Sequence, residues 1–87
     1  MGLDTVEFIL FAEKEFAIAL PDSKLAEIRT IGEFVSLVEE QCSLAGQETN
    51  RTAVFEWVKR TLVSRFEVPE PKITPSAEFV RDLGLDQ

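Results

Sequence analysis

The chain has 87 residues, 45% hydrophobic and 29% charged, a composition that predicts one small packed domain and excludes a disordered segment. Sixteen acidic against nine basic residues give a net charge of −7, which disfavours nucleic acid and anionic membranes and favours basic protein surfaces as partners. No apolar run is long enough to span a bilayer and no signal-peptide pattern opens the chain, so a cytoplasmic location is expected.

The first predicted element is an amphipathic helix over residues 4–16. Asp4 is expected to cap it, with Glu7 completing a capping-box-like pair. A loop follows, because Pro21 favours an extended conformation at the residue before it, and Asp22 is expected to cap a short helix through Arg29. The apolar positions of the first helix recur every three or four residues, at Val6, Ile9, Leu10, Ala12 and Phe16.

A second capping box, formed by Thr30 and Glu33, predicts a helix through Val38 that ends near residue 40. Small and polar residues then predict a linker over residues 41–50. The single cysteine, Cys42, falls in this linker and is expected to be an unreactive thiol. Because the chain has one Cys and no His, neither a zinc site nor a Cys-His dyad is expected.

The strongest helical periodicity lies in residues 51–66, where apolar residues such as Val54, Leu62 and Phe66 share one face. Pro69 and the residues around it are expected to stop this helix. Residues 67–87 are then expected to form a long loop that follows the surface of the helices.

The two ends of the chain carry complementary halves of one motif. Residues 82–86 read Asp-Leu-Gly-Leu-Asp, and residues 2–7 read Gly-Leu-Asp-Thr-Val-Glu. Placed end to start, they resemble the modification site of acyl carrier proteins, Asp-Leu-Gly-x-Asp-Ser-Leu-Asp-x-Val-Glu, whose serine carries a 4'-phosphopantetheine arm. In this chain the serine position falls on Gln87 or Gly2, and neither side chain has a hydroxyl.

The rest of the chain resembles the same family in a changed order. Residues 4–38 are similar to its second half and residues 54–86 to its first half. The resemblance implies a single all-α domain over residues 1–87, an acyl-carrier-protein-like four-helix bundle with the circularly permuted order II, III, IV, linker, I. Helices II–IV would occupy residues 4–40, the linker 41–50, helix I 51–66 and the long loop 67–87. An unrelated four-helix domain and a dimer that exchanges helix I remain alternatives.

The resemblance also implies a function without catalysis. With the serine absent, we expect no prosthetic group, no catalytic residue and at most a weakly bound structural ion. In the family, acidic positions of helix II dock basic patches of partner enzymes. This implies a non-catalytic interaction module for fatty-acid or polyketide enzymes, with partner-binding residues Asp4, Glu7, Glu13, Asp82 and Asp86.

Lys14 departs from the pattern, because the family usually has an acidic residue at that position.

The alternative function is a small acyl-chain or lipid binder that uses the helical core. Its cavity would be lined by Phe8, Phe11, Phe16, Phe34 and Phe66.

Overall fold

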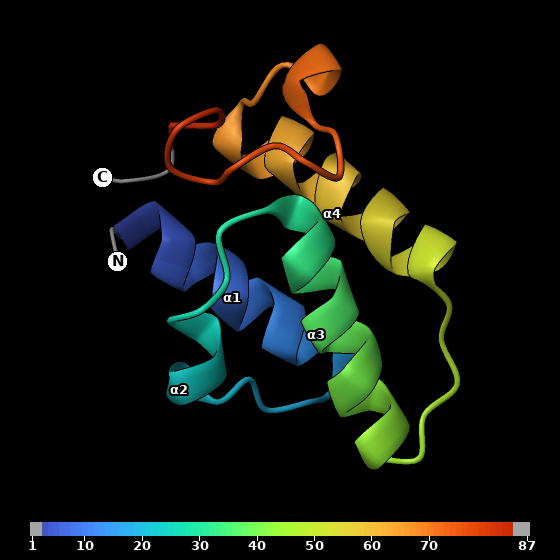
Figure 1. The fold of residues 1–87 in the computed structure, drawn as a ribbon. Helices are drawn as coiled ribbons and strands as arrows, with labels where there is room; N and C mark the ends of the chain where they lie inside the picture. Colours follow the sequence, from blue (N-terminus) through green and yellow to red (C-terminus); the bar gives the residue numbers. More distant parts are fainter. Residues whose placement is uncertain (1–2, 85–87) are drawn as a thin grey trace.

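The protein is all-helical in the computed structural model, which describes the backbone of residues 3–84 and the side chains from Thr5 onward. The elements in chain order are α1 (Leu3–Phe16), α2 (Asp22–Leu25), α3 (Ile31–Leu44), α4 (Arg51–Phe66) and a 3-10 turn, η1 (Glu70–Lys72). Across the described range there is no strand, and Thr30 and Glu78 form an isolated β-bridge. In Figure 1 the segment after α4 (orange to red) returns toward the start of α1 (blue).

Helix α1 differs from the prediction in where it begins and in the face that it buries. It begins at Leu3, so Asp4 lies inside the helix and is not its cap. The core face carries Phe8, which is 1% exposed, whereas Leu10 of the predicted apolar face is 54% exposed. The helix is therefore rotated so that Phe8, Ile9 and Ala12 face the core, and the burial of the Phe8 ring removes a large apolar surface from water.

Helix α2 is a single turn and ends at Leu25, short of the predicted end at Arg29. Pro21 occupies its N-cap position and Asp22 is its first residue, so the predicted Asp22 cap is wrong. After Leu25, the amide of Glu27 donates to the carbonyl of Lys24, a tighter bond than the α-helical pattern. Leu25 is buried, which ties this short turn to the core.

The predicted capping box of α3 is confirmed. The hydroxyl of Thr30 accepts the amide of Glu33 at 3.1 Å, and the Glu33 carboxylate accepts the amides of Thr30 and Arg29 at 3.0 and 2.8 Å. These two backbone donors stabilise the carboxylate, so they hold the pKa of Glu33 below its ordinary value. The start of α3 thus follows from local sequence.

The end of α3 was predicted incorrectly. The helix continues past residue 40 to Leu44, so residues 45–50 remain as the linker. Cys42 is not a linker thiol but a core residue, 1% exposed, placed one turn after the buried Val38. Burial raises the pKa of the Cys42 thiol, which keeps it protonated and unreactive.

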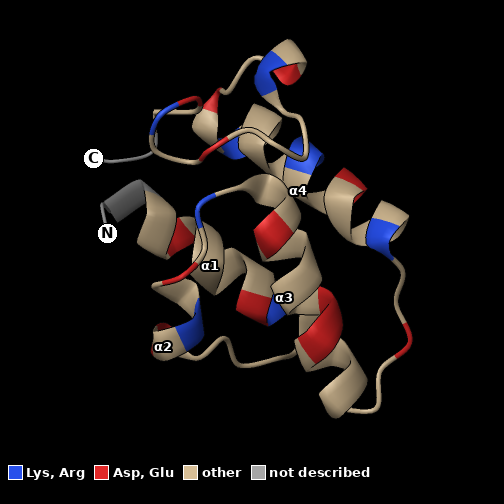
Figure 2. Cartoon of the chain, viewed as in Figure 1, with Lys and Arg blue, Asp and Glu red and all other residues tan. Residues whose placement is uncertain are grey.

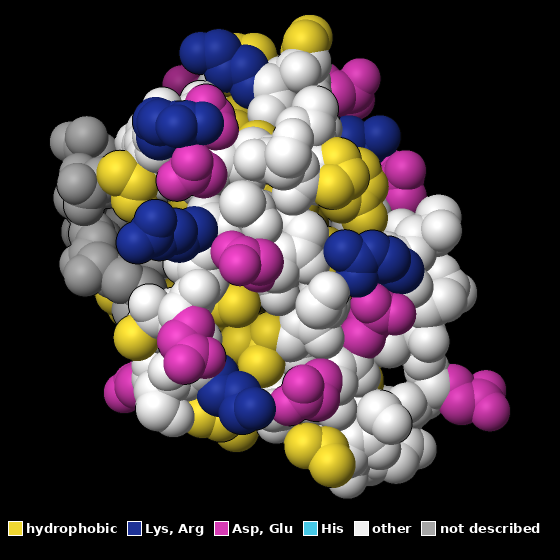
Figure 3. Space-filling model, in the orientation of Figure 1, with side chains coloured by type: hydrophobic (Ala, Val, Ile, Leu, Met, Phe, Trp, Pro, Cys, Tyr) yellow, Lys and Arg dark blue, Asp and Glu magenta, His cyan; other side chains and the backbone are white. Residues whose placement is uncertain are grey.

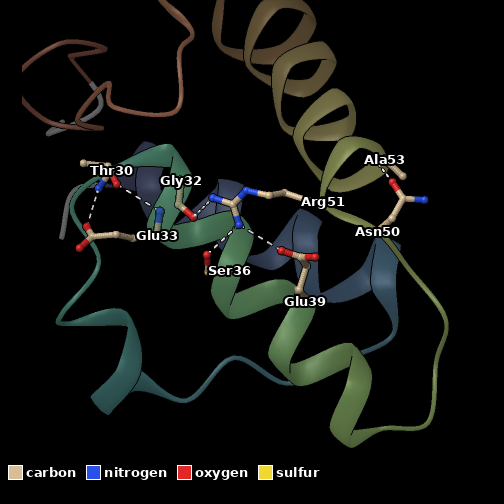
Figure 4. A network of polar contacts seen from close by, with 8 residues as sticks. All are labelled: Thr30, Gly32, Glu33, Ser36, Glu39, Asn50, Arg51 and Ala53. Carbon is tan, nitrogen blue, oxygen red and sulfur yellow. Dashed lines mark hydrogen bonds and ion pairs between the residues drawn. The ribbon is translucent and has the colours of Figure 1, made fainter.

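Helix α4 has the predicted bounds, with Asn50 as its N-cap through a 2.8 Å bond from the amide of Ala53. Its first residue, Arg51, fixes the helix against α3 (Figure 4). The guanidinium donates to the Ser36 hydroxyl at 2.8 Å and to the Gly32 carbonyl at 3.2 Å, and it pairs with Glu39 at 3.1 Å. Because these groups are exposed, the ion pair itself contributes at most about 1 kcal/mol.

The segment after α4 belongs to the core, whereas the sequence predicted a loop lying on its surface. Ile73, Ala77 and Phe79 are buried. The backbone of this segment pairs with the start of α3, because the amide of Ile31 donates to the Ala77 carbonyl and the amide of Gly32 to the Pro75 carbonyl. These bonds hold the C-terminal segment beside the start of α3, although the two are far apart in the sequence.

We predict that Gly32→Ala destabilises the protein, although alanine is usually favoured in a helix. The new Cβ would lie 2.9 Å from the carbonyl oxygen of Pro75, a backbone atom that cannot move without breaking its bond to the Gly32 amide. We expect a net loss of about 1–3 kcal/mol in the free energy of unfolding, measured by urea titration. Ser43→Ala, at the exposed far end of α3, is the control and should change stability by less than about 0.5 kcal/mol. An increase in stability with Gly32→Ala would contradict this close approach.

Candidate functional site

An apolar pocket of about 290 Å³ lies where α1, α3 and the C-terminal segment meet. Helix α1 contributes Thr5, Phe8 and Ile9 to its walls, the segment after α2 contributes Ile28, and the C-terminal segment contributes Phe79. The ring of Phe8 is 5.8 Å from that of Phe79. Residues from opposite ends of the chain therefore form one wall, beside the first turns of α1.

The aromatic lining of this pocket was only partly predicted. Phe8 and Phe34 line it, whereas Phe11, Phe16 and Phe66 do not. Phe11 packs against Phe66, with ring centroids 6.3 Å apart, and Phe16 packs against Trp57. Phe79 and Ile28 were not predicted to line a pocket. Phe79 lies in a segment without helical periodicity, and Ile28 was expected in a short helix that in fact ends at Leu25.

Charged groups at the pocket differ in whether they already have a partner. Glu78 pairs with Arg81 at 3.2 Å, and its amide donates to the Asp82 carboxylate at 2.8 Å. Arg29 also lines the pocket and is exposed, and it forms no ion pair with any described residue. Arg29 is therefore the cation of this pocket, and its charge also helps to lower the pKa of the nearby Glu33 carboxylate.

Of the residues expected to bind partners, Glu7 has an exposed side chain, whereas the carboxylates of Glu13 and Asp82 accept backbone amides. Glu7 is exposed on α1. Glu13 is half-buried, and its carboxylate accepts the amide of Leu20 at 2.8 Å, so it holds the turn after α1. Asp82 holds the amide of Glu78 in the same way and also lies 3.7 Å from the guanidinium of Arg81. Glu7 and Glu13, six positions apart, project about 120° from each other around the helix.

The remaining predicted positions lie outside the part of the chain that can be placed. Asp4 belongs to α1, but its side chain is outside the described set. Asp86 and the two candidate positions of the missing serine, Gly2 and Gln87, lie outside the described residues. The expected convergence of the acidic residues at the two ends therefore stays a prediction.

Charges are mixed over the described surface. Figure 2 shows Lys and Arg distributed from α2 to the C-terminal segment, and on the face in Figure 3 cationic and anionic side chains alternate. Among the side chains from Thr5 to Gly84, no three Cys, Asp or Glu residues gather as ligands for a metal ion. In the same part of the chain, no helix has both the length and the apolar character to cross a membrane.

The chain is similar to acyl carrier proteins over part of its length. It is 42% identical over 39 residues to the acyl carrier protein of Porphyromonas gingivalis, a match that covers 45% of this chain and 50% of the relative. It is 44% identical over 40 residues to that of a Picosynechococcus species, covering 46% of this chain and 49% of the relative. The chain thus spans about half the length of the curated relatives that it matches. No family model and no solved structure matches it.

We predict that Glu13 acts mainly on stability. Glu13→Ala leaves the buried Leu20 amide without its acceptor, which should cost about 1–2 kcal/mol. Glu15→Ala removes an exposed carboxylate from the same helix and should change stability by less than about 0.5 kcal/mol. Thermal unfolding followed by circular dichroism compares the two variants. Equal midpoints would show that the Glu13 carboxylate is free for a partner.

Proposed function

We propose that this chain is a circularly permuted, acyl-carrier-like interaction module of the cytoplasm that carries no phosphopantetheine arm. It docks basic surfaces of fatty-acid or polyketide enzymes through the exposed part of α1. The partial similarity to acyl carrier proteins supports the carrier-like role, and the all-helical structure is consistent with it. The absence of a serine at Gly2 and Gln87 supports a role without the arm.

Two observations support the permuted order. The half-motifs at the two ends of the sequence are complementary. In addition, Thr5 near the start of α1 and Val80 near the end of the described chain line the same pocket. New chain ends are tolerated best where few contacts are lost, and residues 45–50 are short enough to serve as the new connection between neighbouring helices.

The docking surface that we propose is the α1 patch, defined as Val6, Glu7 and Leu10. Positions three and four apart share one face of a helix, so these side chains are neighbours. Val6 and Leu10 are exposed apolar side chains and Glu7 is an exposed carboxylate. An apolar centre beside a charge is a usual composition for a protein interface, and the charge would guide a basic partner.

A second candidate function is the binding of a small acyl chain or lipid. The observation that favours it is the apolar pocket beside α1, which is open to a ligand and lies next to the α1 patch. Docking and chain binding could therefore operate on the same side of the molecule.

We predict that the chain competes with an acyl carrier protein for a phosphopantetheinyl transferase. Modification of the Porphyromonas gingivalis carrier protein, followed by mass spectrometry, should be inhibited at 50 mM salt and several-fold less at 300 mM, because salt screens exposed charges. Glu7→Lys should weaken the inhibition several-fold, whereas Glu48→Lys, exposed in the linker, should not. Inhibition that is independent of salt and of Glu7 would contradict docking through the α1 patch.

We also predict that the arm can be restored by reversing the permutation. The parent should gain no mass when incubated with coenzyme A and the transferase. The variant lacks Met1, Gly2 and Gln87. Its Asp86 is joined through a new serine to Leu3, and the chain is opened within residues 45–50. This variant should gain one phosphopantetheine.

The same variant with alanine in place of the new serine is the control and should stay unmodified. Modification of the parent would contradict the proposal that this chain has no arm. If the joined variant loses its helical circular dichroism spectrum, the permutation itself is contradicted, because the two half-motifs then do not belong side by side.

A further inference from the structure

We infer that the pocket beside α1 binds a free medium-chain fatty carboxylate without a covalent bond, and that Arg29 receives the carboxylate. This inference rests on the second candidate function, chain binding, and not on docking.

The walls of the pocket suit a saturated chain. Phe8 and Phe34 have ring centroids 5.2 Å apart, and Phe79 lies 5.8 Å from each of them. Ile28 adds an aliphatic side chain. A volume of about 290 Å³ lies at the lower end of the usual range for ligand pockets, so a short or medium chain fits better than a long one.

The head group is selected by Arg29. The guanidinium presents a planar fork of donors that matches a carboxylate. Glu78 pairs with Arg81, and the Glu33 carboxylate accepts two backbone amides. The charge of Arg29 attracts the Glu33 carboxylate, but the two groups form no ion pair. On a chain of net charge −7 an anion is repelled in general, so its binding requires a local cation such as Arg29.

A free ligand is favoured over a tethered one by the sequence at the two ends. In the family motif the tether is attached to a serine, and neither Gly2 nor Gln87, the two positions that correspond to it, has a hydroxyl. A fatty acid brings its own polar end, which can stay at the exposed Arg29 while the chain enters the apolar pocket.

The test is titration calorimetry of the full chain with hexanoate, octanoate and octanol, below their aggregation concentrations. Each buried methylene should tighten binding about fourfold, so octanoate should bind about 15-fold more tightly than hexanoate. Octanoate should also bind several-fold more tightly than octanol. Arg29→Gln should remove this preference while leaving octanol binding unchanged, and Arg29→Lys should retain part of it.

Arg60→Gln is the matched control, because Arg60 is an exposed arginine of α4 that does not line the pocket. Amide chemical shifts in NMR spectra locate the ligand, and octanoate should move the signals of Thr5, Ile28 and Phe79. Octanoate that fails to bind, or that shifts signals elsewhere, would overturn the inference.

Equal affinities for octanoate and octanol, with no effect of Arg29→Gln, would also overturn it, although chain binding would then stand. The transferase competition assay separates these results from docking, because it depends on Glu7 and on salt rather than on Arg29.

Discussion

The fold depends on the burial of one aromatic ring, that of Phe8, which is 1% exposed. Four rings from three other parts of the chain surround it: Phe34 of α3 at 5.2 Å, Trp57 and Phe66 of α4 at 5.6 and 6.0 Å, and Phe79 at 5.8 Å. Each aromatic pair adds about 0.5–1.5 kcal/mol beyond the burial of area. Because every long element and the C-terminal segment meet this ring, it determines how α1 is rotated and where the segment after α4 returns.

The same ring connects the core to the candidate site. Phe8 lines the pocket on one side and packs against α4 on the other, so the cavity is a continuation of the core. The C-terminal segment closes it through Phe79, whose amide donates to the Arg29 carbonyl at 3.0 Å. This bond places the cation and the aromatic wall beside each other, which combines a charged head-group site with an apolar chain site.

Net charge describes this surface poorly, because several carboxylates stabilise the fold. Glu13, Glu33 and Asp82 accept backbone amides, and such carboxylates are less available to a partner than the exposed Glu7. An acidic composition therefore favours a basic partner in general, but the hydrogen bonds decide which residues can meet it.

By itself, the sequence determined the features that depend on neighbouring residues. The Thr30 and Glu33 capping box, the end of α4 before Pro69 and the all-helical class were predicted from the sequence, whereas the Asn50 cap that begins α4 was not. The similarity to acyl carrier proteins was also visible in the sequence. Only the tertiary structure decided which face of α1 is buried, how far α3 extends beside Cys42, and that Arg29 stands at a pocket wall. The physical reason is that these features arise from contacts between distant segments, where packing overrides local preference.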